Sequence, residues 1–281
     1  MRGRGLVRTV GAARAAFALA AVALLTPAGP ARAETEVDLA LVIAVDVSFS
    51  MDPEEQALQR DGFVDAFRSP IVHDAIARGA VGRIAVTYVE WAGAGDQRVL
   101  LPWSVMAGAA DANAFAAELA TKPTRRASRT SISGAIDFAV KLQEEGGFAA
   151  TRRVIDVSGD GPNNAGRPVQ VARDEALARD LTINGLPVML KTGGYYDIPD
   201  LDLYYRDCVI GGAGAFMVPA RSKEQFRDAV KTKIIMEIAT RPVPGRSFAA
   251  GPGGADIVLA QAGSRANCLA GEQQWRDRMG N

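Results

Sequence analysis

The sequence predicts an α/β fold in three layers, in which a mostly parallel central sheet lies between helices on both faces. Strand-like and helix-like segments alternate along residues 34–240, as in sheets built from parallel strands and crossover helices. The first strand-like segment, residues 37–45 (VDLALVIAV), is aliphatic at nearly every position. Such a run is typical of a strand that is covered on both faces, as strands of a parallel sheet are.

A helix start follows this strand directly. In residues 52–55 (DPEE), Asp52 is placed as the N-cap, Pro53 in the first turn and Glu55 where it completes a capping box. We therefore expect a helix from here to about residue 67. Further helices are predicted at residues 69–79, 109–120, 131–145, 167–180 and 222–239.

One strand is expected at an edge of the sheet. Residues 97–106 read as a strand but contain Pro102, which lacks the backbone N–H that a central strand donates. The fold expected is thus Rossmann-like, with a mostly parallel sheet and one antiparallel edge strand. The other strands are predicted at residues 82–93, 151–159, 182–190 and 214–220.

Residues 1–33 have the three parts of a secretory signal. Four arginines precede the apolar run 15–25 (AAFALAAVALL), and Ala31 and Ala33 form a small-x-small cleavage site. The run is shorter than the roughly 20 residues of a membrane-spanning helix, so a cleaved signal is favoured over a membrane anchor. We expect a mature chain that starts at Glu34 and is periplasmic or secreted.

The mature chain is expected to hold one domain, residues 34–240, and a Pro/Gly-rich linker and tail, residues 241–281. Loss of the five arginines of the signal leaves 27 basic and 32 acidic residues, a net charge of −5. This balance gives no indication of nucleic-acid binding, and no later segment is apolar enough to span a membrane. Cys208 and Cys268 either form one disulfide or are a buried free thiol and an unrelated tail cysteine; both readings stay open.

Oxygen-bearing side chains occur in three loops that a parallel sheet would bring to one edge. Asp46, Ser48 and Ser50 follow the first strand at every second position, so they can face one point. Thr130 precedes the helix at 131–145, and Asp160 follows the strand at 151–159. In open α/β sheets, ligands bind outside the carboxyl ends of the strands.

Two carboxylates and three hydroxyls form an all-oxygen set, which suits a hard cation such as Mg²⁺ or Mn²⁺ rather than zinc or copper. The two acids balance the charge of a dication, and one coordination position is left for water or for an acidic side chain of a partner protein. The alternative is that these residues form a merely structural turn. Neither cysteine lies near the three loops, and the single histidine, His73, is on another helix.

This pattern resembles the metal-ion-dependent adhesion site of von Willebrand factor type A (VWA) domains, with Asp-x-Ser-x-Ser after a strand, Thr before a helix and Asp-Gly after a later strand. The resemblance covers roughly residues 36–240, and YVEWAG, TINGLPV and YYRDCVIGG are similar to a bacterial secreted subgroup of these domains. It implies that Asp46, Ser48, Ser50, Thr130 and Asp160 hold the cation. Gly159 departs from the commoner Thr-Asp-Gly, which removes a hydroxyl beside the ligands and is expected to weaken the site.

The function expected is that of an extracytoplasmic protein-binding module, not an enzyme, which captures a partner through the cation. The alternative is a Mg²⁺-dependent phosphohydrolase with Asp46 as nucleophile. Such enzymes carry the motif Asp-x-Asp, in which the second aspartate is the general acid. In this sequence Ser48 takes the place of the second aspartate, so the general acid is missing. A serine hydrolase is disfavoured as well, because VSGDG is not a nucleophile elbow.

Two further features have competing explanations. Four of the five tyrosines lie in residues 195–205 (YYDIPDLDLYY), which is either a partner surface or a segment packed against the sheet edge; packing is favoured. Asn163 and Asn164 are interpreted as turn residues rather than as part of the cation site.

Overall fold

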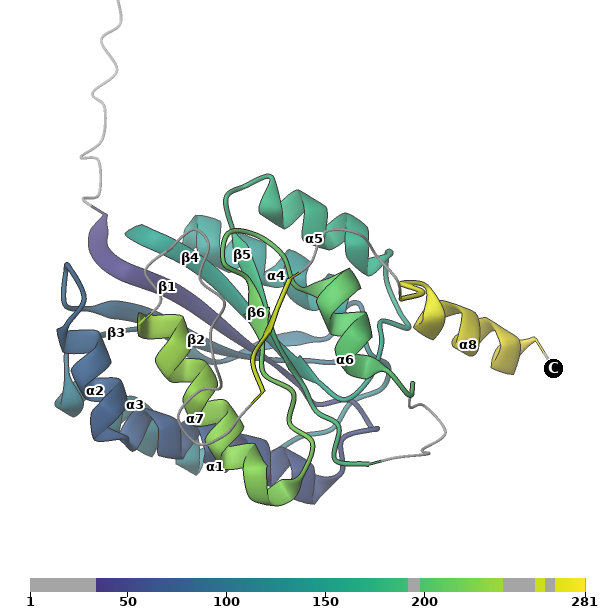
Figure 1. Cartoon of the computed structure of the whole chain (residues 1–281), viewed down its shortest axis with the longest axis horizontal. Coiled ribbons are helices and arrows are strands. Elements are labelled where there is room, and N and C mark those ends of the chain that lie inside the picture. The colour runs from purple at the N-terminus through teal and green to yellow at the C-terminus, as the bar shows by residue number, and fades with distance from the viewer. Residues whose placement is uncertain (1–33, 192–197, 240–255, 261–265, 281) are drawn as a thin grey trace, which may run out of the picture. The chain divides into compact units, whose positions relative to one another are not determined.

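A sheet with the strand order β3-β2-β1-β4-β5-β6-β7 forms the centre of the fold (Figure 1). The computed structural model describes residues 34–191, 198–239, 256–260 and 266–280. Among these residues, the pairs β2–β3 and β6–β7 at the two edges are antiparallel and the inner pairs are parallel. The strands are β1 (Thr35–Asp46), β2 (Ile84–Trp91), β3 (Gln97–Met106), β4 (Phe148–Gly159), β5 (Thr182–Pro187), β6 (Phe216–Met217) and β7 (Val258–Leu259).

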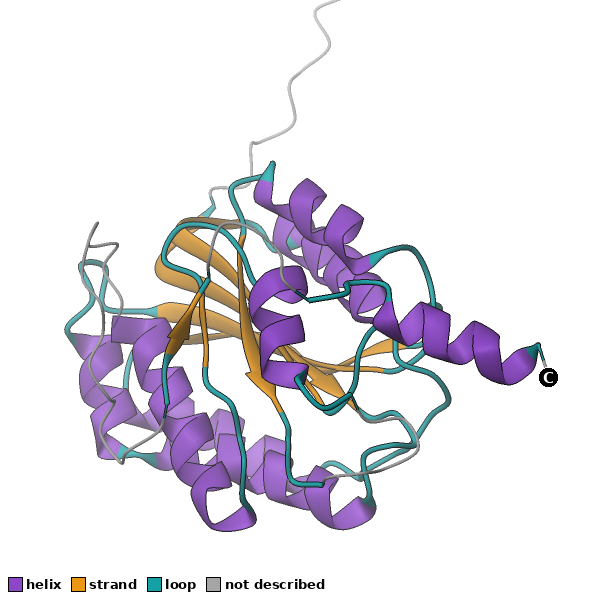
Figure 2. Ribbon diagram, turned by 45° about the vertical axis from the view of Figure 1, so that its right-hand side comes forward, coloured by secondary structure: helices purple, strands orange, loops and turns teal. Residues whose placement is uncertain are grey.

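Helices cover both faces of this sheet, as Figure 2 shows. Alternate residues of β1 enter two separate cores: Leu41 and Ile43 pack with α1, α2, α3 and α7, whereas Val42 and Ala44 pack with α4, α5 and α6. Burial on both faces explains why β1 is a continuous aliphatic run. The helices are α1 (Pro53–Arg68), α2 (Pro70–Ala77), α3 (Ala109–Thr121), α4 (Ile132–Glu145), α5 (Val169–Leu177), α6 (Leu201–Tyr204), the π-helical turn η1 (Tyr205–Val209), α7 (Lys223–Ala239) and α8 (Ala270–Met279).

The predicted start of α1 is confirmed. The side chain of Asp52 accepts a hydrogen bond from the backbone N–H of Glu55 at 2.8 Å, and the Glu55 carboxylate accepts one from Asp52 N at 2.9 Å. Lys191, which follows β5, forms ion pairs with both carboxylates. These contacts hold the start of α1 beside the loop that leaves β1.

The three-layer α/β fold and its mostly parallel sheet are confirmed, and β3 with Pro102 is an antiparallel edge strand as predicted. The second antiparallel edge was not predicted. It arises because Val258 and Leu259 pair with Met217 and Phe216. A strand of two residues is too short to show any periodicity in the sequence.

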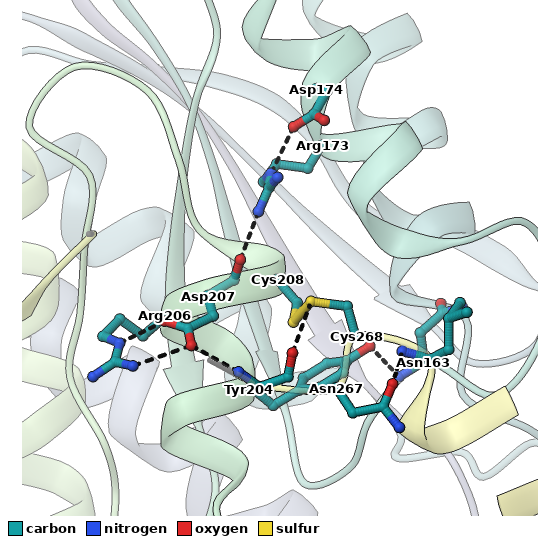
Figure 3. The surroundings of a disulfide bond; sticks show 11 residues. Asn163, Arg173, Asp174, Tyr204, Arg206, Asp207, Cys208, Asn267 and Cys268 are labelled. Atoms are coloured by element: carbon teal, nitrogen blue, oxygen red, sulfur yellow. Dashed lines mark hydrogen bonds and ion pairs between the residues drawn. A yellow bond between two sulfur atoms is a disulfide. The ribbon is translucent and has the colours of Figure 1, made fainter. Parts of the chain in front are cut away.

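Two stretches beyond residue 240 are part of this fold, although the sequence indicated only a linker and tail there. One is β7, and the other is α8, which follows a disulfide between Cys208 in η1 and Cys268, with the Cα atoms 5.5 Å apart (Figure 3). The disulfide settles the question that the sequence left open. The backbone N–H of Ala266 also donates to the Asp207 carboxylate at 3.0 Å, so the chain before Cys268 is fixed at a second point.

The expected packing of the tyrosine-rich segment is confirmed for its described half. Tyr204 and Tyr205 are fully buried in the core that also contains residues of α4 and α5, and the Tyr204 hydroxyl accepts from Asn163 N at 3.1 Å; Tyr195 and Tyr196 lie outside the described residues. The predicted signal, residues 1–33, lies outside them as well. Among the helices that are described, none is both long enough and apolar enough to cross a bilayer.

Candidate functional site

Asp46 is the last residue of β1 and is completely buried at the carboxyl edge of the sheet. Its Oδ1 atom accepts a hydrogen bond from the backbone N–H of Ser48 at 2.7 Å, which bends the chain back over the strand end. Ser48 in turn forms a parallel bridge with Ala127, in the loop that precedes α4. The first loop is therefore held against the second by the backbone itself.

A chain of hydroxyls links this loop to the third one. Ser48 Oγ lies 2.8 Å from Ser50 Oγ, and Ser50 Oγ donates to Asp160 Oδ1 at 2.6 Å. Asp160 directly follows Gly159, the last residue of β4. Because β4 is the parallel neighbour of β1, the ends of the two strands lie at the same edge of the sheet.

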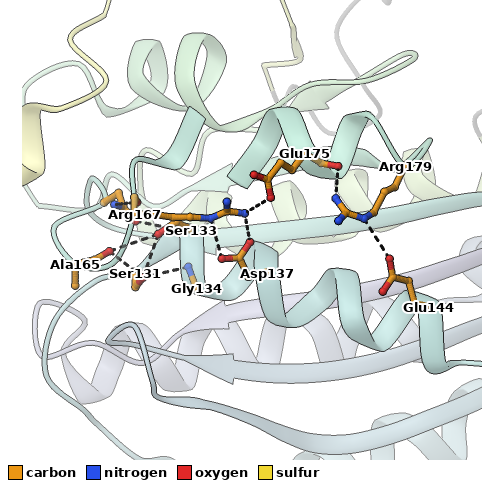
Figure 4. A network of polar contacts seen from close by, with 10 residues as sticks. Ser131, Ser133, Gly134, Asp137, Glu144, Ala165, Arg167, Glu175 and Arg179 are labelled. Atoms are coloured by element: carbon orange, nitrogen blue, oxygen red, sulfur yellow. Dashed lines mark hydrogen bonds and ion pairs between the residues drawn. The ribbon is translucent and has the colours of Figure 1, made fainter. Parts of the chain in front are cut away.

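Thr130 is placed by the start of α4. The side chain of Ser131 caps this helix by accepting from Gly134 N at 3.1 Å and donates to the carbonyl of Ala165 at 2.9 Å (Figure 4). The Thr130 N–H donates to the Asn164 side-chain oxygen at 2.9 Å. Thr130 is nearly fully buried, and the loop after β4 fixes its backbone.

An arginine joins the same two elements further along. Arg167 forms ion pairs with Asp137 of α4 at 2.6 Å and with Glu175 of α5 at 2.8 Å (Figure 4). These groups are partly exposed, so each pair contributes little by itself. Together with the Ser131 contacts they connect the third loop to the N-terminal half of α4.

The three loops enclose a pocket of about 90 Å³. Ser48, Ser50 and Thr130 line it, Asp160 is bonded to Ser50, and Asp46 lies beneath Ser48. The five residues singled out in the sequence thus come together in one place. Within the part of the chain that the structure describes, no three His, Cys, Asp or Glu side chains cluster as they do in many metal centres, so a cation here would depend on the hydroxyls.

The electrostatics of the pocket favour a positive charge. Burial, and next the negative charge of Asp160, raise the pKa of Asp46 well above its ordinary value, while contacts with Ser48 and the Asp160 backbone oppose this. Asp46 Oδ2 is buried without a hydrogen bond in the described structure. An unpaired buried carboxylate oxygen is costly, and a cation would satisfy it. The oxygen donors, their charge and this orphaned atom all fit a hard dication.

Gly159 is required by close packing at this point. A Cβ atom at this position would lie 2.8 Å from Asp46 Oδ2 and 3.1 Å from the hydroxyl of Tyr205. The Tyr205 hydroxyl also lies 3.4 Å from the Gly159 carbonyl oxygen. Tyr205 therefore fills the space in which the threonine of the commoner Thr-Asp-Gly motif would place its side chain.

Asn163 and Asn164 do more than form a turn. Asn163 is fully buried; its side-chain oxygen accepts from Ser133 N at 3.0 Å, and its amide donates to Glu272 of α8 at 2.8 Å. Asn164 accepts from Thr130, as described above. The sequence showed only two polar residues after Gly-Pro, and nothing in that pattern indicates partners 30 or more residues away.

The sequence also provided no prediction of the residues at the mouth of the pocket. Arg129 lies over the ring of Trp275 of α8, with its guanidinium carbon 3.7 Å from the ring centroid, and both residues line the pocket. Phe49, 58% exposed, lines it too and stacks with Arg126 at 5.4 Å. Trp275 stands in the segment that looked like a tail, so no sequence signal placed it here.

Residues 36–242 match the family described as "Protein of unknown function (DUF1194)". The chain belongs to this family. The matched region of this DUF1194 protein contains the three loops but ends before β7 and α8. Comparison with curated proteins finds no similar sequence.

Solved structures of low sequence identity have the same fold, that of a VWA domain. A VWA protein from Catenulispora acidiphila superposes with a TM-score of 0.52 at 13% identity, over 72% of this chain and 43% of that one. Proximal thread matrix protein 1 of the mussel byssus gives 0.53 at 13% identity, over 73% and 49%. The pilus adhesin SpaC of Lactobacillus rhamnosus GG gives 0.54 at 10% identity, over 73% and 31%. This DUF1194 chain thus spans less than half of each of these chains.

Proposed function

We propose that this protein is a binding module that holds a divalent cation, Mg²⁺ or Mn²⁺, and captures a protein partner through it. Asp46, Ser48, Ser50, Thr130 and Asp160 would supply the oxygens that hold the ion. The cation would then attract a carboxylate of the partner. The observation that carries the proposal is the hydrogen-bonded chain from Ser48 through Ser50 to Asp160, above a buried Asp46 oxygen without a partner.

Two similar structures support this proposal. SpaC is a pilus adhesin. One structure of the mussel byssus protein, with a TM-score of 0.50 at 13% identity, has zinc in its metal-ion-dependent adhesion site (MIDAS) motif. In the present chain the hydroxyls are neutral, so the two carboxylates alone would balance the charge of a dication. Such a set favours a hard ion such as Mg²⁺ or Mn²⁺.

Binding is favoured over hydrolysis by the position of Ser48. A phosphohydrolase with Asp46 as nucleophile needs a general acid two residues further on, where this chain has a hydroxyl that is hydrogen-bonded to Ser50. Serine is not acidic enough to donate a proton to a leaving group at neutral pH. A phosphatase assay with Mg²⁺ tests this choice, since turnover that Asp46→Asn abolishes would reverse it.

We also propose that the protein acts outside the cytoplasm, in the periplasm or the medium. The disulfide between Cys208 and Cys268 supports this, because such bonds persist in oxidising compartments. The signal-like composition of residues 1–33 supports it as well. N-terminal sequencing of protein recovered from the periplasm tests it, with a start at Glu34 expected.

The binding of Mn²⁺ alone tests the cation site. We expect Mn²⁺ to bind the wild-type protein and to stabilise it by about 2.7 kcal/mol when free Mn²⁺ is 100 times its dissociation constant. Asp160→Ala should abolish both effects. Asp74→Ala is the matched control, since Asp74 is an exposed aspartate on α2 whose loss should leave Mn²⁺ binding unchanged.

Partner capture is tested by pull-down from periplasmic extract in Mg²⁺ and in EDTA, with Asp46→Ala alongside. The proteins retained should be present only with Mg²⁺ and wild-type bait. Equal retention under all three conditions would refute the proposal, as would a wild-type protein that binds no Mn²⁺.

A further inference from the structure

The C-terminal helix α8 is fixed to the rim of the cation pocket by three independent contacts. The disulfide joins Cys268 to η1, the Asn163 amide donates to Glu272 at 2.8 Å, and the N-terminal turn of α8 packs on the third loop at Gly271. A Cβ atom at Gly271 would lie 2.1 Å from the carbonyl oxygen of Asn163, so only glycine permits this approach. The helix therefore has a defined place beside the site.

From this place α8 presents Trp275 to the pocket. Arg129, from the loop before α4, stacks on the indole at 3.7 Å and donates to the Asn164 carbonyl oxygen at 2.6 Å. The backbone of Arg129 has a φ of 75°, a left-handed conformation that costs free energy for a residue with a side chain. The surrounding contacts thus hold this arginine between the tryptophan and the third loop.

The helix borders the pocket but does not fill it. The one acidic side chain in its first turn, Glu272, is directed to the Asn163 amide, and of α8 only Trp275 lines the pocket. At about 90 Å³, the pocket has room for a single side-chain head group rather than a small-molecule ligand, which typically needs 300 Å³ or more. This size suits one side chain of a larger partner.

The charge and the apolar surface at the mouth of the pocket indicate the chemistry of this partner. Arg129 and Arg126 are positively charged, and the aromatic rings beneath them belong to Trp275 and Phe49. Complementary charge selects an acidic segment, and the exposed ring of Phe49 with the half-buried ring of Trp275 favours an apolar or aromatic neighbour in it.

We propose that α8 is one wall of the partner-binding surface, and that this surface takes an acidic protein segment whose carboxylate enters the pocket while an adjacent aromatic residue packs on Trp275. The proposal rests on the cation site proposed above. It assigns a binding role to a segment outside residues 36–242, the region that matches the family. The disulfide supports that role, because Cys208–Cys268 is one of the three contacts that hold the start of α8 in place.

Three peptides test the proposal on the full mature chain loaded with Mn²⁺: acetyl-Phe-Asp-Phe-amide, acetyl-Ala-Asp-Ala-amide and acetyl-Phe-Asn-Phe-amide. Broadening of the peptide proton resonances by protein-bound Mn²⁺ measures binding close to the ion. We expect the first peptide to bind about fivefold more tightly than the second, which is a usual gain for an aromatic contact. The third peptide should not bind, since it lacks the carboxylate.

Variants of α8 then locate the aromatic contact. Trp275→Ala should bring the preference for phenylalanine below about twofold while Mn²⁺ affinity stays within about twofold of wild type, because α8 supplies no metal oxygen. Trp275→Phe should keep part of the preference. Met279→Ala is the matched control, since Met279 is an exposed apolar residue of the same helix, 71% exposed, and does not line the pocket.

The outcomes separate the two proposals. If Mn²⁺ binds and Trp275→Ala keeps the full preference for phenylalanine, α8 is not a wall of the surface and the cation site stands. If the asparagine peptide binds as well as the aspartate peptide, the acidic partner is wrong. A wild-type protein that binds no Mn²⁺ overturns both proposals together.

Discussion

Substitution of Gly159 by alanine is expected to destabilise the protein, although the same change two residues later is not. The added Cβ atom would stand 2.8 Å from Asp46 Oδ2 and 3.1 Å from Tyr205 Oη, both of which belong to fully buried side chains. Ordinary contacts of this kind begin at about 3.4 Å. Neither neighbour can move freely, because Asp46 is bonded to Ser48 and Tyr205 lies in the core.

Overpacking of this kind costs about 1–3 kcal/mol of unfolding free energy. Gly161→Ala is the matched control: a Cβ atom there meets nothing within 4 Å, so its effect should lie between neutral and about 1 kcal/mol stabilising. Urea denaturation measures both values, and Mn²⁺ titration shows whether Gly159→Ala also displaces Asp46. If Gly159→Ala and Gly161→Ala proved equally stable, Tyr205 could not be said to occupy the place of the threonine side chain.

Two further predictions concern stability away from the pocket. Burial raises the pKa of Asp156 from 3.8 to about 6 against the opposing charge of Lys233. The folded protein therefore keeps a proton that the unfolded chain releases, so stability should fall by up to about 3 kcal/mol as the pH rises from 4 to 6; Asp156→Asn should flatten this slope, and equal slopes in urea denaturation would contradict it. Replacement of both Cys208 and Cys268 by serine opens a loop with a sequence separation of 60, which should lower the unfolding free energy by about 4 kcal/mol. An unchanged urea midpoint would show that the disulfide does not constrain the chain.

Much of the fold could be predicted because its signals are local. The aliphatic run of β1 and the capping box at Asp52 and Glu55 are properties of neighbouring residues, and the structure has both. The grouping of the three loops could be predicted from topology, because parallel strands end at the same edge of a sheet. The hydrogen bond from Ser50 to Asp160 spans 110 residues, yet the order of the elements already required such contacts.

The parts that could not be predicted depend on distances between remote segments. Val258 and Leu259 become a strand only because β6 offers unpaired backbone groups, and no pattern of two residues indicates that. Whether Cys208 forms a disulfide depends on the distance between the two cysteines in the fold, and the number of cysteines in the sequence does not give that distance. Trp275 is held near the pocket by that disulfide together with the contacts of Asn163 with α8, so its role could not be inferred before these contacts were known.

The second and third loops of the pocket hold one another through groups that a cation would not use. The Asn163 and Asn164 side chains accept from the backbone of Ser133 and Thr130, and the Ser131 hydroxyl bonds to the Ala165 carbonyl oxygen. None of these atoms belongs to the five proposed ligands, apart from the backbone N–H of Thr130. The pocket is therefore arranged by contacts that remain when the ion leaves. It follows that chelation should abolish capture of the partner without unfolding the protein, and a far-ultraviolet circular dichroism spectrum that is unchanged in EDTA would accompany the loss of binding. Unfolding in EDTA would instead mean that the ion is a structural element and that the loops cannot support one another alone.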